Sequence, residues 1–137
     1  MDAGVPALTS SLDRAREALH RVYGFADFRP GQEEILAAVL GGDDVMAIMP
    51  TGSGKSLLFQ LPALIGDGLT VVVSPLIALM RDQVAQLRGY GVAAAALNSA
   101  ADGPERAAIY EGLESGDLRL LYVAPERLLR DDTLELL

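Results

Sequence analysis

The stretch Met49-Pro50-Thr51-Gly52-Ser53-Gly54-Lys55-Ser56 decides how the rest of the chain is interpreted. It follows a strand-like apolar run that begins near Val45, and it opens a helix-like stretch over residues 55–64. Glycines in such a turn let successive backbone N–H groups point into one concavity, and the helix that follows adds its positive end. The strand–turn–helix context therefore predicts a loop that binds phosphate groups.

Lys55 is the single lysine of the chain, because ten of its 11 basic residues are arginine. An ammonium is a compact charge that suits the β- and γ-phosphates of a nucleotide better than the flat guanidinium fork of arginine does. The hydroxyl of Ser56 is placed to bind Mg²⁺. The longer form of the motif has glycine where this chain has Met49, so the match is to the short form Gly-x-Gly-Lys-Ser. The alternative is an ordinary glycine-rich turn with a solvated Lys55.

Length and composition exclude several classes of protein. The chain has 137 residues, enough for one domain, and 50% of them are hydrophobic, which excludes a disordered or collagen-like chain. The formal net charge of −8 excludes a strongly basic DNA-coating protein. Without cysteine there is no disulfide framework and no cysteine-bound zinc. We find no signal peptide and no membrane span, so we expect a cytoplasmic protein without a membrane partner.

Strand-like and helix-like segments alternate along the chain. Strand-like runs begin near Val45, Val71, Ala93 and Leu118, and helix-like stretches cover residues 55–64, 76–88 and 104–114. This βαβ pattern predicts an α/β fold in which helices flank a parallel sheet.

Two further helices are predicted before the phosphate loop. Residues 1–10 form a loose tail, and Ser11 is a candidate N-cap of a helix that ends at Gly24. Pro30 occupies the first position of the second helix. Among the polar residues of these segments, His20 is interpreted as a helical residue rather than a metal ligand. Far downstream, Asp131-Asp132 is likewise interpreted as a helix N-cap pair.

Four blocks of sequence occur in an order that resembles one protein family. They are YGF with FRPGQEE at 23–25 and 28–34, the loop at 49–56, VVVSPLIALMRDQ at 71–83 and LYVAPERL at 121–128. The chain is similar to the start of the helicase core of the RecQ family of ATP-dependent DNA helicases. The resemblance covers nearly the whole chain after about Leu12. It implies a partial RecA-like P-loop NTPase domain over residues 11–137, with ATP and Mg²⁺ as cofactors.

The resemblance assigns three residues to adenine, namely Phe25, Arg29 and Gln32. A glutamine amide can pair with adenine N6 and N7, and an aromatic ring and a guanidinium can sandwich a base. The resemblance also makes Lys55 the catalytic cation and Ser56 the metal ligand. The loop residues expected to bind the nucleotide are Pro50, Thr51, Gly52, Ser53, Gly54, Lys55 and Ser56. The alternative is that Phe25 and Phe28 are core aromatics and Gln32 is solvated; of the two rings, we assign Phe28 to the core.

The third and fourth blocks each place a strand end, a proline and a helix start in succession. Such strand ends offer backbone N–H groups to phosphate, and the resemblance implies contact with single-stranded DNA. The candidate residues are Ser74, Arg81, Asn98, Ser99 and Arg127. The alternative is that Arg81 and Arg127 form surface ion pairs while the neighbouring leucines belong to the core.

The resemblance implies 3′-to-5′ unwinding of DNA coupled to ATP hydrolysis by a longer, nucleoid-associated parent that acts on single strands and duplex junctions. The Asp-Glu-Ala-His carboxylates of the family do not occur in these 137 residues. We therefore expect a truncated, ATP-binding front half that does not hydrolyse ATP by itself. The alternative is a non-catalytic nucleotide- or DNA-binding module that is complete as it stands.

Overall fold

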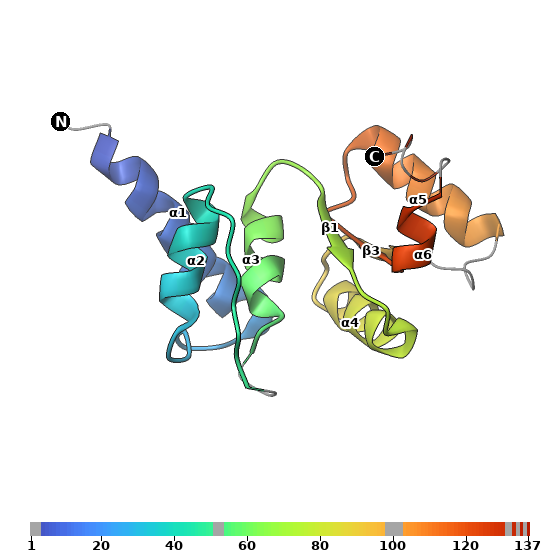
Figure 1. Cartoon of the computed structure of the whole chain (residues 1–137). Helices are drawn as coiled ribbons and strands as arrows, with labels where there is room; N and C mark the ends of the chain where they lie inside the picture. Colours follow the sequence, from blue (N-terminus) through green and yellow to red (C-terminus); the bar gives the residue numbers. More distant parts are fainter. Residues whose placement is uncertain (1–3, 51–53, 98–102, 131–132, 134, 136) are drawn as a thin grey trace. The chain divides into compact units, whose positions relative to one another are not determined.

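The computed structural model describes residues 4–50, 54–97, 103–130, 133, 135 and 137. These residues divide into two compact units, Met1–Asp67 and Gly68–Leu137 (Figure 1). The first unit is helical and includes the described end of the phosphate loop, whereas the second contains a β-sheet. Each unit has an apolar core of its own.

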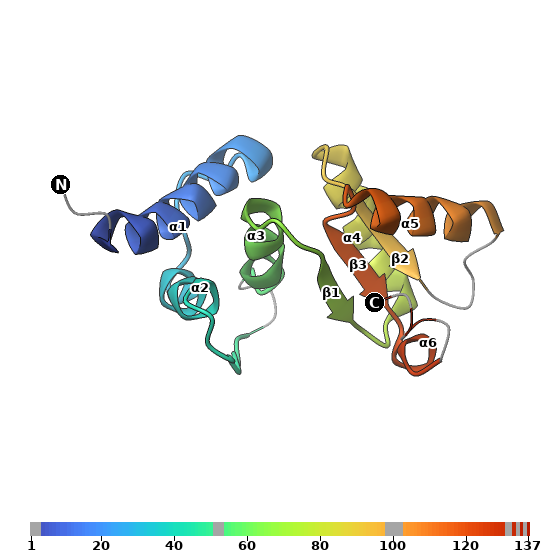
Figure 2. The same cartoon turned by 90° about the horizontal axis from the view of Figure 1, so that it is seen from above.

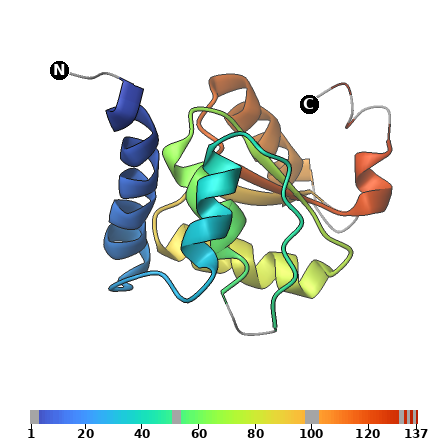
Figure 3. The same ribbon diagram turned by 60° about the vertical axis from the view of Figure 1, so that its left-hand side comes forward.

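The first unit is built from helices that share one core. Its elements are α1 (Gly4–Ala18), the π-helical turn η1 (Leu19–Tyr23), α2 (Gln32–Leu40) and α3 (Leu57–Ile65). Helices α1, α2 and α3 lie side by side (Figure 3). Apolar residues recur at helical spacing on the facing sides and are buried together. The buried members of this core are Ala18, Leu19, Leu36, Leu57, Leu58 and Leu61.

The N-terminal helix begins earlier than the sequence predicts. The pattern predicts a loose tail over residues 1–10 and a helix start at Ser11, but α1 begins at Gly4. Pro6 lies in the first turn, where its missing N–H would have no acceptor within the helix, so it does not interrupt α1. The other end is confirmed, because Gly24 has a φ of 75° and its N–H donates to the carbonyl of His20 at 3.1 Å. Similarly, α2 begins at Gln32 rather than at Pro30.

The prediction of a strand near Val45 is wrong for this structure. Residues 43–50 form no strand, and every strand of the described residues belongs to the second unit. Met46 and Ile48 are 89% and 90% exposed. A β-prone segment becomes a strand only where a neighbouring strand supplies partners for its N–H and C=O groups. No described strand pairs with this segment, and a sequence pattern does not reveal whether such a partner is present.

The second unit contains a parallel three-stranded sheet. Its elements in chain order are β1 (Thr70–Val73), α4 (Ile77–Gly89), β2 (Ala94–Leu97), α5 (Gly103–Ser115), β3 (Leu120–Val123) and α6 (Pro125–Leu128). The strand order is β1-β3-β2, with Thr70 and Ala94 both opposite Leu120. All three strand arrows run the same way in Figure 2. The predicted α/β class, a parallel sheet flanked by helices, is confirmed.

Helices α4 and α5 cover opposite faces of this sheet (Figure 1). On one face, Leu121 and Val123 are buried together with Ile109 of α5. Successive residues of a strand point to opposite faces, so Tyr122 points to the other side. There its hydroxyl donates to Oε1 of Gln83 in α4 at 2.7 Å. The sheet thus contacts α4 through side-chain hydrogen bonds as well as buried apolar residues, and it contacts α5 through apolar packing.

Candidate nucleotide-binding site

The phosphate loop leads directly into α3. Gly54 has a φ of 83°, a backbone conformation that favours glycine. Its carbonyl accepts the N–H of Leu57 at 3.3 Å, which closes the turn that begins the helix. The loop therefore meets a helix N-terminus, as predicted, where the positive end of the helix dipole attracts phosphate. The predicted members that lie outside the described residues are Thr51, Gly52 and Ser53.

The polar side chains of the loop are accessible. Lys55 is exposed, Ser56 is partly exposed, and Pro50 is exposed at the other end of the loop. In the part of the chain that the structure describes, the ion pairs do not involve Lys55. Its ammonium is therefore available to an anionic ligand, which is what a phosphate site requires.

Gln32 connects the predicted adenine block to the phosphate loop. The side chain is only 1% exposed. Its Oε1 accepts the N–H of Arg29 at 2.7 Å, and its Nε2 donates to the carbonyl of Gly54 at 3.1 Å. The alternative of a solvated first-turn glutamine is therefore wrong. The pairing with Gly54 could not be predicted from the sequence, because 22 residues separate the two partners.

Gly54 lies close to the side-chain amide of Gln32. A Cβ atom added at Gly54 would lie 2.4 Å from Nε2 of Gln32. Real Cβ atoms do not approach a nitrogen so closely, so any larger residue at position 54 would displace the Gln32 side chain or the loop. Glycine is thus required at position 54 for two reasons, the positive φ and the close approach of Gln32.

The aromatic residues of the predicted adenine block divide into an exposed and a packed ring. Phe25 is 46% exposed, and its ring stacks on that of Tyr23 with the centroids 6.2 Å apart and 11° between the planes. The hydroxyl of Tyr23 donates to Oε1 of Gln60 in α3 at 2.8 Å. Phe28, in contrast, packs against the core of the first unit, as predicted. The sequence analysis assigned no role to Tyr23 or Gln60, which support the exposed ring of Phe25.

A branched ion pair fixes the segment that carries Phe25 and Arg29. Arg16 of α1 contacts Asp27 at 2.8 Å and Glu33 at 2.7 Å. The same guanidinium lies over the ring of Phe28, 5.0 Å from its centroid. Glu33 lies in the first turn of α2, where a carboxylate interacts favourably with the helix dipole. Arg29 itself is exposed, so an aromatic ring and a guanidinium are both accessible in this block.

The predicted DNA contacts lie in the second unit, where the structure describes three of the five. Ser74 follows β1, and its Oγ accepts the N–H of Leu76 at 3.2 Å. Arg81 is exposed on α4. Arg127 in α6 is only 4% exposed, so a contact with DNA would require α6 to move. Asn98 and Ser99 lie outside the described residues.

The histidine and carboxylate side chains of the described residues do not form a metal site. The described residues contain no group of three histidine or carboxylate side chains placed to hold a metal ion. His20 is exposed, and its Nε2 pairs with the carbonyl of Ala26. Asp131 and Asp132 lie outside the described residues. Among the residues that the structure describes, no helix combines the length and the apolar character needed to cross a bilayer.

Comparison with known protein families gives a match that includes the phosphate loop and most of the chain. The model of the DEAD/DEAH box helicase family matches residues 29–135. The chain belongs to this family. The match begins at Arg29 and includes Gln32, Gly54, Lys55 and Ser56.

Comparison with individual helicases shows which members of the family the chain resembles. The chain is 44% identical over 134 residues to a protein named ATP-dependent DNA helicase RecQ from Haemophilus influenzae, 50% over 115 residues to one from Pasteurella multocida and 48% over 121 residues to one from Synechocystis. These alignments cover 96%, 84% and 88% of this chain, but 22%, 18% and 25% of the relatives. The expected resemblance to RecQ helicases is confirmed. The chain spans about a fifth of the length of the relatives it matches.

Proposed function

We propose that this chain is the ATP-binding part of a DNA helicase that couples ATP hydrolysis to unwinding. Membership of the helicase family implies use of ATP, and the names of the relatives support DNA as the substrate. By the resemblance, unwinding proceeds 3′-to-5′ on single strands and duplex junctions, in the cytoplasm at the nucleoid. The activity of the whole protein needs more chain than these residues, whereas nucleotide binding is carried by residues present here.

In this proposal the triphosphate binds at the start of α3. The ammonium of Lys55 contacts the β- and γ-phosphates, and the positive end of the α3 dipole attracts the phosphate oxygens. The exposure of Lys55 and the glycine conformation at Gly54 support this assignment. Thr51, Gly52 and Ser53 would complete the loop around the phosphates.

The residues present also fit Mg²⁺. This ion keeps several waters and is usually held by one or two protein oxygens together with substrate phosphates, rather than by a protein cage. The hydroxyl of Ser56 is the protein oxygen that we assign to it, beside the phosphate contact of Lys55. When bound, Mg²⁺ would neutralise charge on the phosphate oxygens.

The hydrogen bond from Gln32 Nε2 to the carbonyl of Gly54, 3.1 Å long, is the observation that carries the proposal. It joins the block assigned to adenine with the loop assigned to phosphate in one unit of the protein. Exposed Phe25 and Arg29 are the groups that would sandwich the base. For Gln32 to pair with adenine, its amide would exchange the protein partners Arg29 and Gly54 for the edge of the base.

A binding titration tests this function. A fluorescent N-methylanthraniloyl ATP is titrated into the chain with Mg²⁺, and Lys55→Ala is compared with Arg21→Ala, which removes an exposed cation outside the loop. We expect Lys55→Ala to weaken binding by about tenfold or more, because a charge-assisted contact to phosphate contributes about 1.5–3 kcal/mol. Arg21→Ala should leave the affinity unchanged. Equal affinity of the Lys55→Ala variant and the unmodified chain would refute the phosphate assignment.

A further inference from the structure

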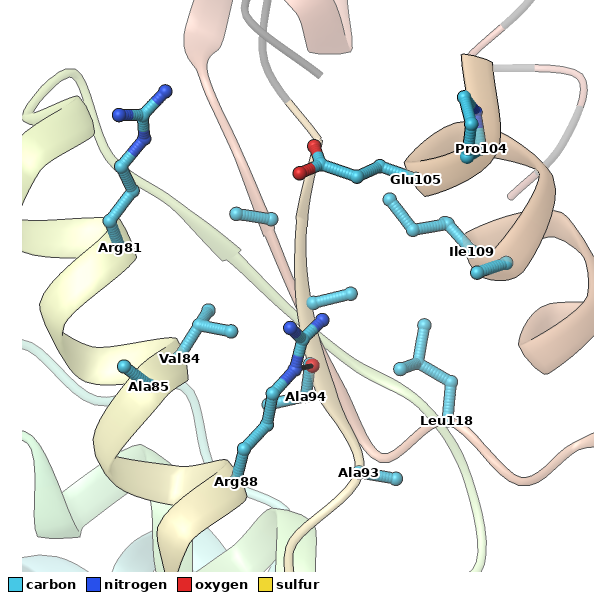
Figure 4. Close-up of a pocket in the computed structure, with 13 residues that line it drawn as sticks. Arg81, Val84, Ala85, Arg88, Ala93, Ala94, Pro104, Glu105, Ile109 and Leu118 are labelled. Atoms are coloured by element: carbon cyan, nitrogen blue, oxygen red, sulfur yellow. Dashed lines mark hydrogen bonds between the residues drawn. The ribbon is translucent and has the colours of Figure 1, made fainter. Parts of the chain in front are cut away.

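A groove runs along the outer edge of β2, between α4 and α5. Its volume is about 630 Å³. Because the strand order is β1-β3-β2, β2 has one neighbour among the described strands and its other side forms the floor of this groove. Figure 4 shows α4 on one side of the strand and α5 on the other, with Arg88 and Glu105 directed toward the strand. The lining residues belong to the second unit alone.

The backbone of β2 presents polar groups to the groove. The carbonyls of Ala93 and Leu97 face β3, where they accept the N–H groups of Arg119 and Ala124 at 2.9 and 3.3 Å. Backbone groups of successive residues in a strand alternate in direction, so those of Ala94 and Ala96 face the groove. The carbonyl of Ala94 accepts Nε of Arg88 at 2.9 Å, shown as the dashed line in Figure 4.

The walls of the groove differ in charge. The α4 wall carries two guanidinium groups, those of Arg81 and Arg88, which are seven residues apart and therefore on one side of the helix. In the described part of the chain the ion pairs involve neither of them. The α5 wall carries the carboxylate of Glu105. The floor is formed by alanines, whose small side chains leave the strand edge accessible except at the carbonyl of Ala94, which Arg88 already contacts.

We propose that this groove binds an extended peptide segment of a partner protein, which adds to β2 as a further strand and directs acidic side chains at α4. Backbone groups at a sheet edge match the backbone of a peptide, and this pairing supplies affinity without a particular sequence. The arginines of α4 then select acidic side chains. A nucleic acid strand fits less well, because its backbone has no alternating N–H and C=O groups to pair with those of Ala94 and Ala96 at the strand edge.

Peptide binding to the isolated chain tests the proposal. The probe is the peptide acetyl-Thr-Val-Glu-Val-Glu-Thr-amide, titrated to about 2 mM while backbone amide signals are followed by NMR, so that even a millimolar Kd is detected. We expect shifts at Ala94 and Ala96 and along α4. The same peptide with lysine in place of glutamate should bind about tenfold more weakly. A version with N-methylated backbone amides should not bind, because it cannot donate to the strand edge.

Variants of the chain provide the matched controls. Arg81→Glu should weaken binding of the acidic peptide by about tenfold, while Arg21→Glu, an exposed arginine outside the groove, should leave it unchanged. The proposal is overturned if the acidic peptide causes no shifts in β2, if the N-methylated peptide binds equally well, or if Arg81→Glu has no effect. It is also overturned if an oligothymidine single strand, and not the peptide, shifts the β2 signals.

Discussion

Gln32 connects the block proposed to bind adenine with the loop proposed to bind phosphate. Its buried amide holds the carbonyl of Gly54 and the N–H of Arg29. A residue with two such partners acts on the loop whether or not it also contacts the base. The two roles differ in what they do to nucleotide selectivity, so they can be separated by measurement.

Replacing Gln32 by alanine separates these roles. If the amide pairs with adenine, Gln32→Ala should lower the preference for ATP over GTP, because the hydrogen-bonding edges of the two bases differ. Loss of the bond to Gly54 should weaken binding of both nucleotides together. Competition of ATP and GTP against the fluorescent nucleotide measures both quantities. An unchanged ratio with weaker binding would leave Gln32 as a support of the loop and remove it from adenine recognition.

Gly54→Ala should destabilise the chain by more than its backbone conformation alone requires. A left-handed conformation costs a residue with a Cβ about 1–2 kcal/mol, and the contact with Nε2 of Gln32 at 2.4 Å adds to that cost. Gly24→Ala is the matched control, since Gly24 has a φ of 75° and no atom within 4 Å of an added Cβ. The free energies of unfolding are measured in denaturant.

The same comparison in a Gln32→Ala background isolates the contact. There the excess cost of Gly54→Ala over Gly24→Ala should disappear, because the opposing amide is gone. An excess that persists without Gln32 would mean that some other neighbour opposes a side chain at position 54.

At the scale of elements, β1 and β3 of the two blocks assigned to DNA are paired strands, and a side-chain hydrogen bond also ties the helix of one block to the strand of the other. Tyr122 lies in the central strand β3 and is 1% exposed, and its hydroxyl donates to Gln83 of α4 at 2.7 Å. The block after β1 therefore has its helix tied to the strand that leads into the fourth block. Any motion of α4 that DNA binding required would have to break or carry this bond.

Tyr122→Phe should lower the free energy of unfolding by about 0.5–1.5 kcal/mol, the usual net contribution of a hydrogen bond. The ring remains, so packing is preserved. Tyr110→Phe is the control, because Tyr110 packs against the α5 face of the sheet and no hydrogen bond of its hydroxyl occurs within the described residues. Denaturant unfolding of both variants gives the comparison. Equal stabilities would mean that the Tyr122–Gln83 bond contributes nothing net.

Elements with local signals are predictable from the sequence, and those that depend on distant partners are not. The alternation of apolar runs and helix-like stretches predicted β1, β2, β3 and the helices between them. Gly24 predicted the end of the first helix, because glycine readily adopts the positive φ that the structure has there. The segment after Val45 has the same apolar character as β1, but no described strand pairs with it. In the site, the loop was predictable from its glycines and lysine, whereas the Gln32–Gly54 contact depends on how α2 and α3 pack.

At the scale of the whole molecule, charge opposes binding of nucleic acid. The chain carries 19 acidic and 11 basic residues, which gives a formal charge of −8. Contacts with DNA would then depend on a few local groups rather than on a broad positive surface.

Binding of this chain to single-stranded DNA should be weak and should depend little on salt. Each phosphate neutralised contributes about 0.7 to the slope of log K against log salt, so about two contacts predict a slope near −1.4. Fluorescence anisotropy of a labelled oligothymidine at several salt concentrations measures this slope. A much steeper slope would reveal a basic surface that the composition conceals.

The open segment after Val45 also has a chemical consequence. Met46 is 89% exposed, whereas Met80 is 1% exposed in the core of the second unit. Dilute hydrogen peroxide should therefore convert the Met46 thioether to sulfoxide well before that of Met80. Peptide mass spectrometry would follow both sites in one sample, with Met80 as the internal reference. Binding of any partner over this segment should slow that oxidation, so the rate at Met46 reports whether the segment is covered.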